Sequence, residues 1–439
     1  MARGQSARLD QKKLLADPIL VTTIIVLIVF LTLFILYPLA ILLVDAVVGE
    51  SGPTLSVLQR VLAMPSFETA ISNTLVLGLF VGIVATLIGL LFAYVEVYVN
   101  LKSRFMSGLF KLVSMLPVVS PPFVLSLSVI LLFGKAGLIT RTLLGIYDNN
   151  VYGFWGIALV QTLTFFPVCY MMFRGLLRNI DPSLEEAARD MGASRWKVFA
   201  SVTLPLILPG MGNAFLVYFM ESIADFANPM IIGGSYDTLA TSIYLQITGA
   251  YDKQGASAMS CVLLGITLIM FIVQKYVLER KSTATLTGTA ARGRMLITDN
   301  SVRIPLSVLC GAVAIFVVAL YICVPIGALF KTWGYDYSLT PKWFIQVFTL
   351  HHGFEAFADS FGLSLIAAPL TALLSMVIAY LVVKRRFAGR GFIEVAGAGH
   401  NAVYSVDGAL IGADSQRYEL PSGIYIVRAD GATRKVVVR

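Results

Sequence analysis

The sequence has little charge. Only 13% of its 439 residues are Asp, Glu, Lys or Arg, against roughly 25% in soluble globular proteins. Hydrophobic residues make up 57% of the chain and gather in runs of about 18 or more, long enough to cross a bilayer as helices. The composition therefore excludes an ordinary water-soluble enzyme and predicts a protein embedded in a lipid bilayer.

Metal-ligand and nucleotide-binding patterns are also scarce. The four cysteines lie inside apolar runs without CxxC spacing, and the three histidines have no partner at metal-ligand spacing. No GxxxxGK[ST] loop occurs, so the chain lacks that means of holding ATP phosphates. We predict no metal site, no cofactor and no enzymatic activity. The excess of 33 Lys and Arg over 25 Asp and Glu indicates membrane orientation rather than nucleic-acid binding.

Eight apolar stretches are predicted to span the bilayer. If the N-terminus is cytoplasmic, the inside segments hold 22 Lys and Arg and the outside segments hold 6. This asymmetry follows the positive-inside rule and predicts a cytoplasmic N-terminus and a cytoplasmic C-terminal tail. The predicted spans are about 19–44, 69–97, 109–133, 151–172, 206–232, 256–276, 304–330 and 361–383.

Two stretches of the chain resemble each other. FETAISNTLVLG begins at Phe67 and FEAFADSFGLSL at Phe354, and a basic turn follows each apolar helix. We interpret them as a duplication whose copies run in the same direction, unlike the inverted repeats of many secondary transporters, which remain an alternative. The predicted fold is an all-α polytopic membrane protein of eight helices with a short C-terminal β appendage. Its predicted parts are a six-helix unit (1–280), a linker (281–302), two helices of a second unit (303–394) and a β-rich tail (395–439).

One inside loop, 174–210, differs from the others. Asp181 can cap a helix with Pro182 at its first position, Gly192 can end that helix, and Ser194 can cap a second short helix. We therefore predict a helix, a tight turn and a second helix before the chain re-enters the membrane. Four apolar residues are spaced to form one stripe on the first helix: Leu184, Ala187, Ala188 and Met191.

The same loop resembles the EAA motif of permease subunits of binding-protein-dependent ABC importers. That pattern is EAA-x3-G-x9-I-x-L-P, and this chain departs from it only at Val202, which replaces Ile. The resemblance implies an inner-membrane permease with a helix that docks on a separate ATPase subunit. It also implies an extracytoplasmic substrate-binding protein as a second partner. The residues that would couple to the ATPase are Glu186, Ala187, Ala188, Gly192, Leu204 and Pro205.

A second stretch, ESIADFANP at 221–229, is similar to the ferric-iron importer permeases. The resemblance implies ferric iron as the substrate, although relatives on this scaffold carry phosphonate, polyamine, thiamine or sulfate. Glu221 and Asp225 are spaced to share one face of the predicted fifth span, and acids inside a membrane are costly and often line a polar path. We predict that they line the substrate pathway together with Asn228; alternatively, they bond neighbouring helices.

The tail has a different composition from the rest of the chain. It is predicted to form short alternating strands at NAVYSV, RYEL, GIYIVRA and TRKVVVR. Its end resembles the end of a type IX secretion sorting domain, and a generic β appendage is the alternative. A second EAA loop is absent from the printed sequence, so a truncated or fused permease that does not transport remains a further alternative.

Overall fold

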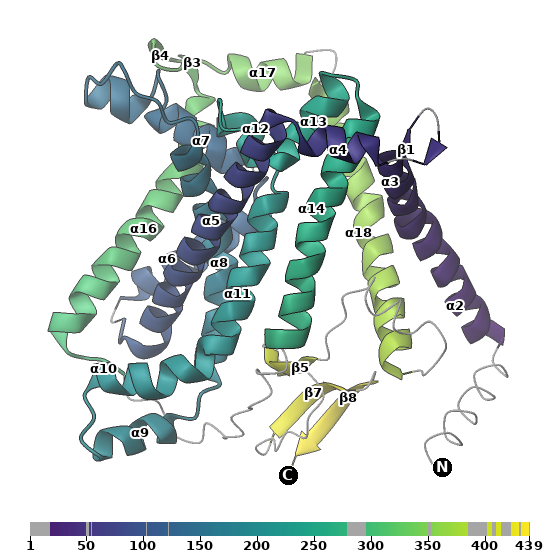
Figure 1. Ribbon diagram of the computed structural model, residues 1–439. Helices are drawn as coiled ribbons and strands as arrows, with labels where there is room; N and C mark the ends of the chain where they lie inside the picture. Colours follow the sequence, from purple (N-terminus) through teal and green to yellow (C-terminus); the bar gives the residue numbers. More distant parts are fainter. Residues whose placement is uncertain are drawn as a thin grey trace. The chain divides into compact units, whose positions relative to one another are not determined.

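The computed structural model divides the chain into two compact units, which we describe separately (Figure 1). The first unit comprises Met1–Ile41 and Gln346–Arg439, and the second comprises Leu42–Ile345. Predictions that concern residues 1–17, the linker from 279 to 295, or most of the tail lie outside the described residues. The structure describes 18–49, 52–53, 55–101, 103–121, 123–278, 296–349, 353–384, 402–405, 410–413, 423–429 and 432–438.

The first unit pairs the beginning of the chain with its last long helix. Helix α18 (Gly353–Lys384) packs Ile378 and Leu381 against four residues of α2, which are Leu20, Ile24, Leu27 and Leu31. A four-stranded antiparallel sheet in the order β6-β5-β7-β8 follows α18 in the sequence. The elements are α2 (Pro18–Leu31), η1 (Thr32–Leu36), α18, β5 (Ala402–Ser405), β6 (Leu410–Ala413), β7 (Gly423–Ala429) and β8 (Ala432–Val438); α3 (Tyr37–Val47) continues from η1 into the second unit.

The second unit is a bundle of long helices with short elements at both ends (Figure 1). The π-helical segments are η2 (Leu138–Leu143), η3 (Phe199–Thr203) and η4 (Gln274–Leu278). The strands are β1 (Val48–Gly49), β2 (Gly52–Pro53), β3 (Phe330–Thr332) and β4 (Asp336–Leu339). The α-helices are α4 (Ser56–Leu62), α5 (Pro65–Tyr98), α6 (Arg104–Val119), α7 (Phe123–Phe133), α8 (Phe154–Arg178), α9 (Pro182–Asp190), α10 (Arg195–Val198), α11 (Leu204–Ala224), α12 (Ala227–Ile232), α13 (Leu239–Thr248), α14 (Lys253–Val273) and α16 (Asn300–Gly327), and α17 (Lys342–Thr349) crosses the boundary between the units.

Among the described residues, eight helices are long and apolar enough to cross a membrane, which agrees with the number predicted. The third predicted span is wrong as a single helix, because the helix is interrupted between α6 and α7, at Ser120 and Pro121. Proline lacks the N–H that would continue a helix. The spanning segments are Leu20–Val47, Pro65–Tyr98, Phe123–Leu143, Phe154–Arg178, Arg195–Ala224, Lys253–Tyr276, Asn300–Gly327 and Gly353–Leu381.

Helix α5 is the centre of the second unit. It packs along α8 and α11, and the three helices lie side by side in Figure 1. The ring of Phe92 on α5 lies 5.1 Å from the ring of Phe110 on α6 and 5.1 Å from that of Phe166 on α8, measured between centroids. All three side chains are buried. Tilted aromatic pairs at this spacing add favourable contacts beyond the burial of apolar area.

Helix α16 belongs to this same bundle, although the sequence assigned it to a separate second copy. It packs against α6 and α7 through Ala314, Val317 and other buried residues. The hairpin β3–β4 that follows is also attached to α7, because Trp333 donates its indole N–H to the Leu131 carbonyl at 2.7 Å. The bounds of the compact units thus differ from those of the predicted permease units. The predicted units rest on a duplication in the sequence and stay a prediction.

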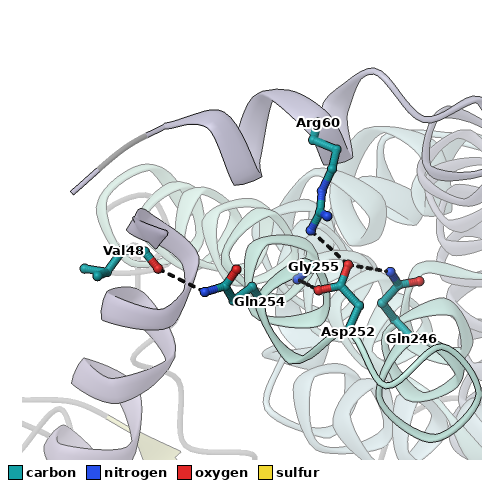
Figure 2. Close-up of polar contacts among 6 residues, drawn as sticks. All are labelled: Val48, Arg60, Gln246, Asp252, Gln254 and Gly255. Atoms are coloured by element: carbon teal, nitrogen blue, oxygen red, sulfur yellow. Dashed lines mark hydrogen bonds and ion pairs between the residues drawn. The ribbon is translucent and has the colours of Figure 1, made fainter. Parts of the chain in front are cut away.

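At the end of the bundle that carries α12 and α13, Asp252 joins three helices (Figure 2). Its carboxylate accepts hydrogen bonds from Arg60 on α4 at 2.9 Å, from Gln246 on α13 at 3.0 Å and from the Gly255 N–H on α14 at 2.8 Å. Partial burial raises the pKa of this carboxyl, but the hydrogen bonds from Gly255 and Gln246 and the charge of Arg60 outweigh burial and hold the pKa below its ordinary value.

We predict that Asp252 stabilises the fold only where it is ionised. Because its pKa is lower in the folded protein, its contribution is present above the ordinary pKa near 4 and is lost as the pH falls through the lower folded value. The melting temperature of Asp252→Asn should lie below that of the parent protein at pH 6, and the gap should close below about pH 4. A gap that stays constant between pH 3 and pH 6 would contradict this prediction.

Candidate functional site

The loop between α8 and α11 folds as its local sequence predicts. Asp181 precedes α9 and accepts a hydrogen bond from the Ser183 N–H at 2.9 Å, with Pro182 at the first helical position. Gly192 follows α9 with φ of +82°, a backbone conformation that favours glycine. Ser194 then caps α10 by accepting from the Lys197 N–H at 3.3 Å. Two short helices therefore meet at a tight turn at one end of the bundle (Figure 1).

A buried glutamate holds this loop against the bundle. Glu185 on α9 is 5% exposed and accepts hydrogen bonds from the Tyr98 hydroxyl, at the end of α5, at 2.5 Å and from the Thr203 hydroxyl in η3 at 2.9 Å. A buried acid is costly unless it is paired in this way. The sequence motif singled out Glu186, which is only partly buried, and missed Glu185. Nothing in the local pattern distinguishes the two adjacent glutamates.

The loop also exposes several large apolar side chains. Leu184 and Ala187 are exposed on α9, Met191 is 82% exposed at its end, and Trp196 on α10 is 74% exposed. Ala188 departs from the predicted stripe because it is buried against the bundle. Large apolar side chains grouped on a surface mark a site of contact with another molecule. The loop is thus held to the bundle by Glu185 and exposes apolar side chains.

The end of the motif leads the chain back into the bundle. Leu204 begins α11 and packs against the main core, and Pro205 follows it in the first turn of that helix. Helices α10, η3 and α11 form one continuous helical segment, Arg195–Ala224, and the Leu204 N–H bonds the Phe199 carbonyl in the π-helical turn just before Pro205. Proline lacks an N–H, and it lies directly after this irregular turn. The structure therefore places Glu186, Ala187, Ala188 and Gly192 in or beside the exposed helix, and Leu204 and Pro205 at its junction with the bundle.

The predicted fifth span is also wrong as one helix. Helix α11 ends at Ala224, Asp225 has an extended ψ of 120°, and α12 begins at Ala227. Glu221 and Asp225 therefore do not occupy successive turns of one helix. Glu221 is exposed on α11, whereas Asp225 lies in the break. The break precedes Asn228 and Pro229, which lie within α12.

Asp225 is the centre of a polar network. Its Oδ2 atom accepts hydrogen bonds from Gln161 Nε2 on α8 and from Asn228 Nδ2, both at 2.8 Å. Ser222 donates to Gln161 Oε1 at 2.6 Å, and Ser126 on α7 donates to Asn228 Oδ1 at 2.8 Å. Irregular backbone at membrane depth is tolerated only where its polar groups find partners inside the protein. The network supplies such partners and joins α7, α8, α11 and α12.

Two members of this network, Asp225 and Asn228, were predicted from the sequence as site residues, and the others were not. Gln161 is fully buried in an otherwise apolar helix, and an amide at membrane depth indicates a hydrogen-bonded partner. That signal could have identified Gln161 but not its partner. The serines at 126 and 222 give no such signal, because serine satisfies its hydroxyl within many membrane helices.

The described residues thus form a bundle of membrane helices with interrupted spans and a helical loop at one end. Residues 78–283 match the family described as the binding-protein-dependent transport system inner membrane component. The matched range includes α8 to η4 and the whole loop of α9 and α10. This match and the eight apolar helices of the described residues identify the chain as a multi-pass inner-membrane protein.

Among curated proteins, the chain is similar to the ferric transport system permease protein of Actinobacillus pleuropneumoniae. The two are 34% identical over 429 residues, which is 95% of this chain and 62% of the relative. The chain therefore spans less than two thirds of that relative's length. It is also 28% identical over 166 residues to the molybdenum transport system permease protein of Escherichia coli K12, covering 37% of this chain and 72% of the relative.

Among solved structures, the chain resembles a chain in the crystal structure of a bacterial alginate ABC transporter in complex with an alginate-pentasaccharide-bound periplasmic protein. The TM-score is 0.52, the sequence identity is 17%, and the match covers 63% of this chain and 99% of that one. At this identity the likeness concerns the fold alone.

Proposed function

We propose that the chain is the transmembrane permease of an ABC importer that moves ferric iron inward with energy from a separate ATPase subunit. The observation that carries this proposal is the set of exposed apolar side chains on the loop, Leu184, Met191 and Trp196, beside the EAA pattern. A helix docked in a groove buries such side chains near the centre of the contact. The chain itself would be a conduit rather than an enzyme, and a partner would hydrolyse ATP.

Ferric iron is proposed as the substrate because the similarity to the ferric transport permease extends over 95% of the chain. The similarity to the molybdenum permease covers 37% of it, which leaves other substrates on the same scaffold as the alternative. Within this proposal, 1–280 forms one permease unit and 303–394 begins a second. A substrate-binding protein would deliver the substrate at the end of the bundle opposite α9 and α10. The resemblance of the tail at 395–439 to a sorting domain stays a prediction.

The proposal requires α9 and α10 to face the cytoplasm, with the N-terminus and the C-terminal tail on the same side. The distribution of Lys and Arg between alternate segments supports this orientation. Cysteines introduced singly at Met191, between α9 and α10, and at Tyr335, between β3 and β4, test it, because both side chains are more than 80% exposed. The two pairs of elements lie at opposite ends of the bundle (Figure 1). An impermeant thiol reagent added to intact cells should label Tyr335→Cys alone. Labelling of Met191→Cys under those conditions would reverse the orientation.

We predict that Gly192→Val and Glu186→Lys weaken ATPase binding. At Gly192 a β-branched side chain would be forced to a φ of +82°, so the turn would change and displace α9 relative to α10. Co-purification of the ATPase subunit of a ferric importer with the full chain in membranes should fall at least about tenfold, which corresponds to 1.4 kcal/mol. Glu186→Lys should act by charge reversal and leave the turn intact.

The matched control is Gly175→Val on α8, where an added Cβ meets no atom within 4 Å. It should insert into the membrane and retain the ATPase. Undiminished ATPase binding by both loop variants would end the coupling proposal, provided that the parent chain binds the ATPase in the same assay.

A further inference from the structure

The segment before α16 lies at the loop end of the bundle. Ile297 donates its backbone N–H to the Tyr98 carbonyl at 2.7 Å, and its own carbonyl accepts from the Asn100 N–H at 3.1 Å. These bonds make a parallel bridge in which Ile297 pairs with Val99, directly after the end of α5. Both side chains are buried, at 3% and 2% exposure, within the main core. From the sequence, this segment was predicted to be part of the linker 281–302.

The bridge meets the loop through Tyr98. The carbonyl of this residue accepts the bond from Ile297, and its side-chain hydroxyl donates to Glu185 on α9. One residue of α5 is therefore bonded to the segment before α16 on one side and to the exposed helix on the other. Glu185 also accepts from Thr203, so the contact extends to the far end of the loop.

A second contact joins the same segment to α10. Asp299 caps α16 by accepting from the Ser301 N–H at 3.0 Å, and its other carboxylate oxygen lies 3.9 Å from Arg195, the first residue of α10. Hydrogen bonds from Ser301, and to a lesser extent the charge of Arg195, lower the pKa of this carboxyl. The side chains of Asp299 and Arg195 are about half exposed, so their attraction is weak and serves orientation more than stability.

We propose that Leu296–Asp299 forms a strap that positions the α9–α10 loop, so that α16, the first helix of the predicted second unit, sets where this loop lies. The strap is attached to the end of α5 by its backbone and to α16 by continuity of the chain. A displacement of α16 would therefore be transmitted to α9 through the hydrogen bonds of Tyr98 with Ile297 and Glu185. Only the identity of the molecule that binds the loop rests on the proposed function.

The strap can be tested without an ATPase. Ile297→Ala removes a buried side chain from the bridge, and Leu296→Ala makes a similar change at the adjacent position, which is 45% exposed. Hydrogen exchange should be measured on the full chain in nanodiscs. In Ile297→Ala the amides of 182–203 should exchange at least about tenfold faster than in the parent, as expected for local opening. Leu296→Ala should match the parent, and Ile297→Val should fall between them.

Two outcomes would overturn the strap. One is equal exchange of 182–203 in Ile297→Ala and Leu296→Ala. The other is an equal increase in α13 at the opposite end, which would show general destabilisation. Asp299→Asn keeps a capping oxygen but removes the charge, so it should change exchange less than about threefold. Failure of the proposed function would appear differently, as no ATPase binding by the parent while the exchange difference between the two alanine variants persists.

Discussion

Replacing Gly89 with leucine should prevent α5 from packing against α8 and leave little folded protein in the membrane. A Cβ at Gly89 would lie 2.4 Å from Cys169 Cβ and 2.8 Å from the Tyr170 backbone nitrogen. Backbone atoms cannot move aside as a side chain can, so the two helices would have to separate. Separation would open the core around Phe92 and Phe166, at a cost on the order of 3 kcal/mol or more.

Gly175→Leu is the matched control for this change. It introduces the same side chain on α8, at a position where a Cβ would meet no atom within 4 Å. Size-exclusion chromatography in detergent should give a single sharp peak for Gly175→Leu and a low, aggregated yield for Gly89→Leu. Equal yields and equal melting temperatures for the two variants would refute the close approach of α5 to α8.

The second large effect is expected at Asp225. Asp225→Ala removes the acceptor shared by Gln161 and Asn228, which are both buried, and leaves their amide groups without that partner. The Gln161 amide keeps its hydrogen bond to the Ser222 carbonyl at 3.3 Å, so the main loss is at Asn228. An unsatisfied buried polar group costs about 1–3 kcal/mol, and the loss should be of that size. The interruption between α11 and α12 would then lack the hydrogen bonds that stabilise it.

Glu221→Ala is the comparison, because Glu221 is exposed on α11 one turn away. Its effect on stability should stay within about 0.5 kcal/mol, as for most exposed positions. Thermal unfolding of both variants in nanodiscs measures the difference. If Asp225→Ala were as stable as Glu221→Ala, the network would have no structural role. A role of Glu221 in the substrate pathway would appear instead as reduced uptake at unchanged stability.

The sequence by itself determined the number of spans and the form of the loop. Eight apolar runs became eight long helices because a bilayer allows few alternatives to a helix, so length and composition suffice. The fold of the loop also depends on local interactions. Asp181, Gly192 and Ser194 each act through backbone groups within three residues. The sequence therefore predicted where α9 begins, where the turn falls and where α10 begins, but not that α10 continues through η3 into α11.

Only the tertiary structure decided where the spans break and which helices meet. The break at Asp225 depends on Gln161, 64 residues away in the chain, which supplies the partner that an interrupted helix needs. Glu185 holds the loop because Tyr98, 87 residues earlier in the chain, donates a hydrogen bond to it. The position of α16 depends on apolar packing against α6 and α7. Apolar packing has no direction of its own, and a hydrophobic pattern marks a face without naming its partner, so these pairings came from the packed structure alone.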